Sequence, residues 1–338
     1  MKAILEQLLD GRDLTEEQAG QVMHALTNED FPPAQGGALL AALRSKGETA
    51  AEIRGFANAM RSLAVPVSID VNARPVVDTC GTGGDGSGSL NLSTAAALVC
   101  AAAGAGVVKH GNRSISSRAG SADVLEVLGV PIGLGPEEAA RCWEKLGFTF
   151  LFAPRYHPAM KAVMPIRRAM GVRTVFNMLG PLSNPAAPLF QVIGAFSLEA
   201  TEKMANALSG MTIGRAFVVH GAEGWDEATP IGPYHLFEVR PGVVTHQVRD
   251  PLDVGVPRCS PADLAGGSAE DNARALEALL HGQTGPHQDA VALASGLALE
   301  VCGVASDLTS GVAMARAALI DGRAGTLLDG LREFGEAP

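Results

Sequence analysis

A loop with five glycines, placed directly after an apolar strand, constrains this chain more than any other feature. The strand is expected over Pro75–Thr79, the loop CGTGGDGSGS occupies 80–89, and an alanine-rich helix is expected over Ser93–Ala103. Glycines let backbone N–H groups approach phosphate oxygens, and the N-terminus of the following helix adds a favourable dipole. An ordinary tight turn is the alternative, but it rarely needs five glycines. The segment therefore predicts an anion-binding loop at the carboxyl end of a strand.

Two familiar nucleotide-binding motifs do not account for this loop. Gly81-x-Gly83-x-x-Gly86 formally satisfies the dinucleotide fingerprint, which also expects an acidic residue about twenty positions on. The sequence from Gly86 to Gly120 contains no Asp or Glu. A Walker A loop ends in Gly-Lys-Ser/Thr, whereas the nearest lysine is Lys109. An NAD-dependent oxidoreductase is therefore disfavoured.

Segments of strand and helix length alternate from Arg74 onward. Further strands are expected over Gly106–Lys109, Thr149–Phe152, Gln191–Phe196 and Arg215–Val219, with a hairpin over Tyr234–Arg240 and Val243–Val248. Further helices are expected over Ser121–Leu128, Pro136–Leu146, Leu198–Leu208, Glu270–Leu280, Asp289–Cys302, Asp307–Asp321 and Gly325–Phe334. This alternation predicts an α/β fold with a mainly parallel sheet, which binds ligands beyond the carboxyl ends of its strands.

Residues 1–65 predict helices only. Thr15 with Gln18, and Thr49 with Glu52, each fit a capping box at a helix start. Short helices of this kind have more apolar surface than they can bury among themselves, so they should pack on another domain or on a second copy of the chain. We expect a small all-helical domain over 1–70, which also receives part of 160–190, and a larger α/β domain over 71–338.

Three more polar clusters accompany the glycine loop. KHGNRSISS at 109–117, followed by GSAD at 120–123, combines cations, amides and hydroxyls that suit phosphate. Arg167, Arg168 and Arg173 suit an acidic substrate, although spacing alone does not separate that role from surface solubility. Asp226 and Glu227 offer hard oxygen ligands of the kind that Mg²⁺ takes, with an exposed acidic turn as the alternative.

Composition and charge exclude several classes of protein. Twenty-six basic against 36 acidic residues give a net charge of −10 without a basic block, which disfavours nucleic acid and anionic membranes as partners. The longest uncharged apolar run, Ala95–Val108, is too short to span a bilayer. Five cysteines without a C-x-x-C pair indicate free thiols in a reducing cytoplasm. The histidines lack a zinc-ligand spacing.

In this order along the chain, several motifs resemble the anthranilate phosphoribosyltransferase family. They are VDTCGTGGD, N-x-ST, KHGNR-x-x-SS-x-x-GSAD-x-LE-x-LG, R-x-x-x-G-x-RT-x-FN-x-LGPL-x-NP and VHG-x-x-G-x-DE. The resemblance implies a nucleoside phosphorylase-like fold with the active site at the hinge between its domains, and a homodimer formed through the helical domain. It also implies transfer of the phosphoribosyl group of PRPP to the amino group of anthranilate, with release of pyrophosphate, in tryptophan biosynthesis.

The same resemblance implies roles for individual residues. Those that would bind PRPP are Gly81, Gly84, Asp85, Ser89, Asn91, Leu92, Ser93, Thr94, Lys109, His110, Gly111, Asn112, Arg113, Ser114, Ile115, Ser116, Ser117 and Ser121. Those near anthranilate would be Gly81, His110, Asn112 and Arg167, with Arg167 facing the carboxylate. Those that would hold Mg²⁺ are Ser93, Asp226 and Glu227. No residue is assigned as a catalytic base, because the anthranilate amine is already neutral at pH 7.

The sequence departs from the family pattern at one place, and three functions other than anthranilate phosphoribosyl transfer are open. Ser89-Leu90-Asn91 stands where the family usually has Thr-Phe-Asn; the serine keeps the hydroxyl, and the missing Phe could change the stiffness of the loop. Another aromatic acceptor, or phosphorolysis of a nucleoside, would keep the fold and change the reaction partner. A protein-docking module whose loops merely bind anions would not be an enzyme.

Overall fold

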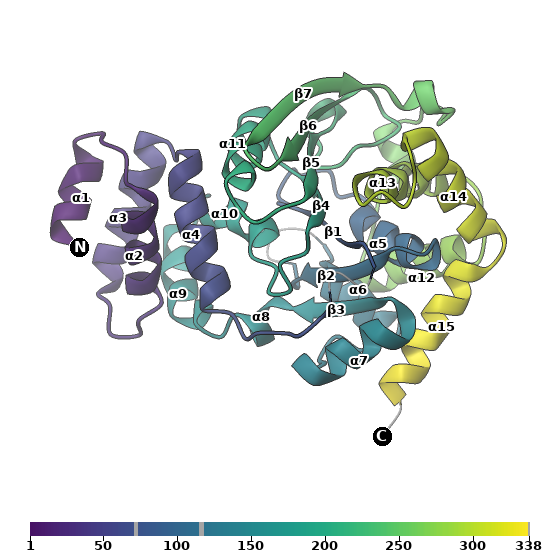
Figure 1. Cartoon of the computed structure of the whole chain (residues 1–338), viewed down its shortest axis with the longest axis horizontal. Helices are drawn as coiled ribbons and strands as arrows, with labels where there is room; N and C mark the ends of the chain where they lie inside the picture. The colour runs from purple at the N-terminus through teal and green to yellow at the C-terminus, as the bar shows by residue number, and fades with distance from the viewer. Residues whose placement is uncertain (71–73, 115–117, 337–338) are drawn as a thin grey trace.

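A computed structural model describes residues 1–70, 74–114 and 118–336 and contains a helical domain beside a larger α/β domain (Figure 1). The N-terminal helices are α1 (Lys2–Leu9), α2 (Glu16–Leu26), α3 (Pro33–Lys46) and α4 (Ala50–Ser62). Both predicted capping boxes are present, with the Thr15 and Thr49 hydroxyls accepting hydrogen bonds from the N–H groups of Gln18 and Glu52. Within the described residues, no helix is long and apolar enough to cross a membrane.

The middle segment contains three helices that were absent from the sequence-based prediction, and two of them join the N-terminal ones. They are α8 (Ala153–Tyr156), α9 (Met160–Met170) and α10 (Phe176–Leu179). Helix α9 packs on α3 and α10 packs on α4 (Figure 1). Pro165 lies inside α9, which explains why the sequence pattern did not indicate a helix there.

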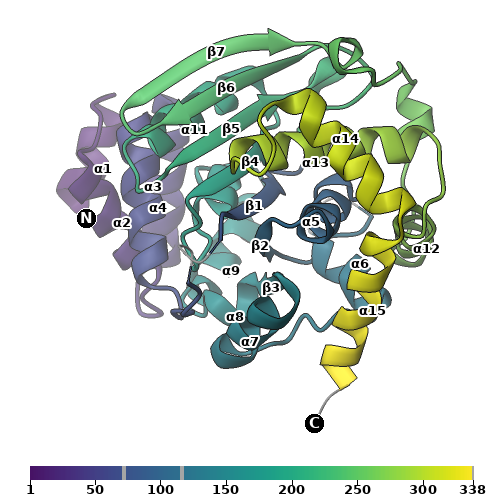
Figure 2. The same ribbon diagram turned by 45° about the vertical axis from the view of Figure 1, so that its right-hand side comes forward.

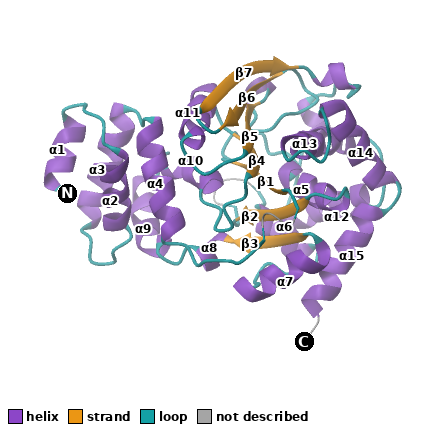
Figure 3. Cartoon of the chain, viewed as in Figure 1, coloured by secondary structure: helices purple, strands orange, loops and turns teal. Residues whose placement is uncertain are grey.

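A seven-stranded sheet forms the centre of the larger domain (Figure 3). Its strands are β1 (Val76–Gly81), β2 (Gly106–Gly111), β3 (Phe148–Phe152), β4 (Phe190–Gly194), β5 (Arg215–His220), β6 (Tyr234–Arg240) and β7 (Val243–Arg249). The order is β3-β2-β1-β4-β5-β6-β7. The first five strands are parallel to one another, β6 is antiparallel to β5, and β7 is antiparallel to β6. The predicted strands are confirmed, but Gln191–Phe196 is too long because β4 ends at Gly194, and β1 and β2 continue two residues further than expected.

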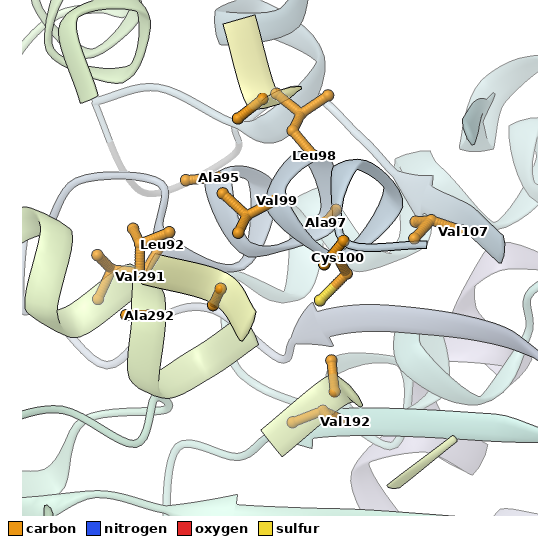
Figure 4. Close-up of a cluster of buried hydrophobic side chains, with 14 of the residues drawn as sticks. Leu92, Ala95, Ala97, Leu98, Val99, Cys100, Val107, Val192, Val291 and Ala292 are labelled. Carbon is orange, nitrogen blue, oxygen red and sulfur yellow. The ribbon is translucent and has the colours of Figure 1, made fainter. Parts of the chain in front are cut away.

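Helices cover both faces of this sheet (Figures 1 and 2). They are α5 (Leu92–Ala102), α6 (Ser121–Val127), α7 (Pro136–Leu146), α11 (Leu198–Ser209), α12 (Ala269–Leu280), α13 (Pro286–Val301), α14 (Leu308–Ile320) and α15 (Arg323–Glu336). Short 3₁₀ turns lie at 180–182, 222–224, 251–254 and 261–264. On one face α5 packs against α13, and Figure 4 shows their side chains meeting between the helices, with Leu92 near Val291. On the other face α11 and α4 share a second core, which joins the two domains.

Glu52 is the polar centre of the helical domain. Its fully buried carboxylate accepts hydrogen bonds from the N–H groups of Leu14 and Thr49, both at 2.8 Å, and from the Lys46 ammonium at 3.0 Å. One side chain therefore ties three separate points of the chain together.

We expect Glu52→Ala to lower the free energy of unfolding of the helical domain by about 3 kcal/mol, because it leaves two buried N–H donors unpaired and removes one of the two carboxylates that bond Lys46. Urea unfolding followed by circular dichroism measures this. Glu29→Ala, at an exposed loop position, is the control and should have almost no effect. Equal midpoints for the two variants would contradict the role assigned to Glu52.

Candidate functional site

The predicted polar clusters meet at one edge of the sheet, where the strand order reverses. Strand β1 has β2 on one side and β4 on the other, and this is the place where open α/β sheets bind ligands. The glycine loop follows β1, Lys109 and His110 lie at the end of β2, and Asp226 and Glu227 follow β5. Clusters that are far apart in sequence therefore share one location.

The glycine loop has the left-handed backbone that its composition predicts. Gly83, Gly84, Gly86 and Gly88 have φ values between 62° and 78°. Asp85 accepts hydrogen bonds from its own loop, from the N–H of Ser87 at 3.0 Å and its hydroxyl at 2.9 Å. It also accepts one from the N–H of Asp226 at 3.2 Å. The loop is thus folded onto the segment that follows β5.

The carboxylates of Asp226 and Glu227 lie directly beneath this loop. The N–H of Gly83 donates to Asp226 Oδ2 at 2.6 Å, and the N–H of Ser93 donates to Glu227 Oε1 at 3.3 Å. Burial and the nearby Asp85 raise the pKa of Asp226 to about 7; burial and Asp226 raise the pKa of Glu227 to about 8. Such closely spaced carboxylates favour a bound cation or proton.

The oxygen donors of this site suit a hard divalent cation that also takes ligands from outside the chain. The Asp226 and Glu227 carboxylates and the Ser93 hydroxyl are oxygen donors of the kind that Mg²⁺ takes. Among the described residues, no group of three or more His, Cys, Asp and Glu side chains forms a metal site. Mg²⁺ usually keeps several waters and binds substrate phosphates, so a partial protein shell suits it.

Glycines at the strand ends allow the carboxylate segment to come so close. A Cβ on Gly194 would overlap the Asp226 carbonyl oxygen, and a Cβ on Gly221 would overlap that of Glu227. A Cβ on Gly81 would lie 2.5 Å from Asp226 Oδ2. Gly221 belongs to the VHG motif found in the sequence, whereas Gly194 was not predicted; its place at the end of β4 was the available signal.

Lys109 is buried under the loop rather than exposed beside it. Its ammonium donates to the Thr79 carbonyl at 2.6 Å and lies 3.5 Å from the Ser93 hydroxyl. Burial lowers the pKa of Lys109, while Asp78 opposes that shift. The cation is therefore held below the metal-ligand candidates Ser93 and Glu227.

The start of α5 is held by side-chain contacts that were not predicted from the sequence. Asn91 accepts a hydrogen bond from the Asn272 side chain at 2.8 Å and donates one to the Ala119 carbonyl at 3.2 Å. Ser89 forms a β-bridge with Ala265. Leu90, the residue that replaces the usual Phe, is a core residue and packs inward.

The two residues that follow in the PRPP motif also face the interior. Leu92 belongs to the core, and the Thr94 hydroxyl is buried with no hydrogen-bond partner among the described residues. Their side chains therefore hold α5 in place, while their N–H groups donate to the carbonyls of Leu90 at 2.7 Å and Asn91 at 3.1 Å.

The second polar loop is partly engaged with its own helix. The Arg113 guanidinium bonds Asp123 at 2.9 Å and Glu126 at 2.8 and 2.9 Å, so a phosphate would have to compete with two carboxylates. The N–H of Ser114 also donates to Asp123, at 3.1 Å. This loop is thus tied to α6 in the absence of substrate.

The remaining residues of the second loop are described only in part. The Ser121 hydroxyl donates to the Asn112 carbonyl at 3.3 Å, and a Cβ on Gly111 would overlap that hydroxyl. Ile115, Ser116 and Ser117 lie outside the described residues.

Two buried histidines lie together at this edge, His110 at the end of β2 and His157 just after α8. The His110 and His157 rings pack edge to face at 5.0 Å, and each has a buried Nε2 with no hydrogen-bond partner in the part of the chain that the structure describes. Burial lowers the pKa of His110 to about 3 and that of His157 to about 4, so both rings are neutral. The Arg167 guanidinium lies 5.1 Å over the Phe176 ring, and burial lowers its pKa. His157 was not predicted from the sequence.

Comparisons with known proteins cover both domains. Residues 2–64 match a glycosyl transferase family helical bundle domain, and residues 73–325 match a glycosyl transferase family a/b domain. The chain is similar to anthranilate phosphoribosyltransferase of Desulforudis audaxviator, with 48% identity over 338 residues covering 99% of this chain and 96% of the relative. It is 50% identical to that of Chloroflexus aggregans over 315 residues, covering 93% of this chain and 92% of the relative.

Solved structures agree with the sequence comparisons. The crystal structure of anthranilate phosphoribosyltransferase (TrpD) from Thermus thermophilus superposes with a TM-score of 0.93 at 45% identity, covering 99% of both chains. The Saccharomyces cerevisiae enzyme, solved in complex with PRPP and Mg, has a TM-score of 0.88 at 24% identity, covering 99% of this chain and 97% of that one. The latter likeness shows the shared fold.

Asp78 beneath the site makes stability depend on pH. It is fully buried, accepts a hydrogen bond from the Asn184 side chain at 2.9 Å, and its pKa is raised by burial to about 6. The folded state therefore holds this proton at a higher pH than the unfolded state, whose Asp titrates at about 4. The stability contribution of the protonated Asp78 is fully present below about pH 4 and is lost as pH rises through about 6.

We expect the difference in unfolding free energy between wild type and Asp78→Asn to shift by about 1 kcal/mol between pH 5 and 7, with wild type losing stability relative to the variant. Urea unfolding at several pH values measures it. A difference that stays constant with pH would show that Asp78 does not titrate in this range.

Proposed function

Because the chain belongs to the anthranilate phosphoribosyltransferase family, we propose that it catalyses the reaction that gives the family its name. It transfers the phosphoribosyl group of PRPP to the amino group of anthranilate, giving N-(5-phosphoribosyl)anthranilate and pyrophosphate, in tryptophan biosynthesis. The observation that best supports this from the chain itself is the pair Asp226 and Glu227 beneath the glycine loop. A buried acidic pair facing an anion-binding loop suits a substrate that arrives as a metal–pyrophosphate complex.

The PRPP site in this proposal is the edge formed by the glycine loop and the loop after β2. Backbone N–H groups of the glycine loop would meet phosphate oxygens, and the N-terminal dipole of α5 would add to their attraction. Lys109 would supply a positive charge from below, and Asn112, Arg113, Ser114 and Ser121 would close the other side. Arg113 would exchange Asp123 and Glu126 for a phosphate group, which it can bind with two parallel hydrogen bonds.

Mg²⁺ is proposed as the cofactor, held by Ser93, Asp226 and Glu227. When bound, it would supply charge stabilisation for the departing pyrophosphate. Glu227 and Asp226 would then be ionised, because a divalent cation offsets the burial and mutual repulsion that raise their pKa values. Lys109 keeps a further positive charge close to this pair.

Anthranilate would bind beside His110 and His157, on the side of the site that faces the helical domain. Arg167 would pair with its carboxylate, Asn112 would hydrogen-bond it, and Gly81 and His110 would lie nearby. Because both His110 and His157 are neutral, neither adds a charge that would compete with Arg167 for the substrate. The Nε2 atoms of these rings, unpartnered among the described residues, offer positions for polar groups of a bound molecule.

The reaction asks little of the chain beyond binding and orientation. Displacement at the anomeric carbon develops positive charge on the ribose and negative charge on pyrophosphate, which backbone donors aimed at the leaving group stabilise. The neutral amine of anthranilate can attack without prior deprotonation. Holding the two substrates in line supplies much of the remaining acceleration.

Assembly, location and domain limits complete the proposal. We propose that the helical domain covers 1–70 with part of 160–190, that the α/β domain covers 71–338, and that the enzyme works in the cytoplasm. We also propose a homodimer formed through the helical domain. Leu9 is 69% exposed there, and a hollow of about 260 Å³ is lined by residues of both its N-terminal and middle segments, including Phe31 and Pro165.

Glu227→Gln tests the metal role without a change of shape. We expect kcat/KM to fall about 100-fold, with a higher Mg²⁺ requirement, because a neutral amide is a weaker ligand at a site that stabilises the leaving group. Pyrophosphate release measured against Mg²⁺ concentration gives both values. Glu223→Gln, exposed in the same loop, is the control and should behave as wild type. An unchanged Mg²⁺ dependence in Glu227→Gln would remove this residue from the site.

Arg167→Lys tests the anthranilate contact. Loss of the planar guanidinium should raise KM for anthranilate about 10- to 100-fold and leave KM for PRPP close to wild type, because lysine keeps the charge but not the two parallel hydrogen bonds to a carboxylate. Arg168→Lys, one residue on and exposed, serves as the control. A rise in both KM values would instead indicate a general disturbance of the hinge.

A further inference from the structure

Arg173 connects the two domains at the glycine loop. It lies between α9 and α10, in the part of the chain that packs with the N-terminal helices. Its backbone carbonyl accepts a hydrogen bond from the Arg44 guanidinium on α3. Its own guanidinium lies 4.3 Å over the Phe196 ring and donates to the Gly84 carbonyl. Three contacts therefore join a helix of one domain to the loop of the other.

Three consecutive loop residues are each held by a different part of the structure. Thr82 Oγ1 accepts a hydrogen bond from the N–H of Phe196 at 3.1 Å, just after β4. The Gly83 N–H donates to Asp226 after β5, and Gly84 is held by Arg173. Phe196 thus serves twice, since its backbone bonds the loop and its ring supports the arginine. Of these three anchors, the one at Gly84 comes from the helical-domain side.

The direction of the Gly84 carbonyl decides where the next N–H points. In a planar trans peptide the C=O and the N–H point in opposite directions, so fixing the Gly84 carbonyl on Arg173 directs the Asp85 N–H away from it. Gly84 has a φ of 74° and no side chain, so its own conformational preference would not hold the peptide in one orientation. An outside contact is needed to fix it.

We propose that Arg173 is a positioning residue that orients the glycine loop for pyrophosphate and couples that orientation to the packing of the helical domain. Arg173 acts on the loop through the Gly84 carbonyl and does not itself bind the substrate. A guanidinium suits this task because its flat face stacks on Phe196 while its edge still donates, which a lysine ammonium does not reproduce.

The kinetic part of this inference rests on the proposed function, so the first test needs no substrate. We expect Arg173→Ala to speed hydrogen exchange of the amides in 82–89 by about 10-fold in the free enzyme, because a charge-assisted hydrogen bond is lost. Exchange in α3 should stay as in wild type. Unchanged loop exchange, or faster exchange throughout the helical domain, would overturn the proposal whatever the activity.

The second test separates positioning from direct binding. Arg173→Ala should raise KM for PRPP about 10-fold, with kcat and KM for anthranilate close to wild type, and Arg173→Lys should not restore it. Phe196→Leu should act in the same direction, and the double variant should be no worse than Arg173→Ala alone, because the two side chains act as one unit. Arg168→Ala is the control.

The other possible results of these two tests also decide whether Arg173 is a positioning residue. A higher KM for PRPP with unchanged loop exchange would show direct substrate binding by Arg173 and overturn the positioning role. Additive effects of Arg173→Ala and Phe196→Leu would overturn the shared support by the ring. A wild-type enzyme inactive toward PRPP and anthranilate would refute the proposed function and leave the exchange result to stand on its own.

Discussion

The close approach of the Asp226–Glu227 backbone to the ends of β1, β4 and β5 is the constraint on which the site depends. Gly81, Gly194 and Gly221 meet this segment where a Cβ could not fit without moving it. The approach brings two carboxylates under the glycine loop, where one accepts a hydrogen bond from the N–H of Gly83 and the other from the N–H of Ser93 in α5. Elsewhere, burying two adjacent acids would be unfavourable; here the loop donors and Lys109 partly offset the penalty.

The chain is acidic overall, yet its proposed substrates are anions. The positive groups are few and individually placed: Lys109 lies beneath the loop, Arg113 is paired with acids, and Arg167 is partly buried over Phe176. Burial strengthens the charges of Lys109 and Arg167 locally because less water screens them, whereas Arg113 is exposed. A net charge of −10 therefore describes the surface and says little about the site.

The strands and the main polar clusters of the site could be predicted from the sequence, because glycines, polar residues and apolar runs each form a local pattern. The hairpin and both capping boxes were predicted for that reason. The contacts that arise only in three dimensions were not: the place of Gly194 at a strand end does not indicate which segment it accommodates, and His157 and Asn272 come from distant segments. Helix α9 was missed because Pro165 interrupts its pattern. The ligand roles of Ser93, Asp226 and Glu227 remain predictions.

The most direct test of the account is the intrinsic fluorescence of anthranilate during turnover. When the intact enzyme is mixed with anthranilate, PRPP and Mg²⁺, the account predicts that the fluorescence disappears, that it does so only with all three present, and that phosphoribosylanthranilate is formed. Fluorescence that persists in a folded preparation, with PRPP and Mg²⁺ in excess, would contradict the account.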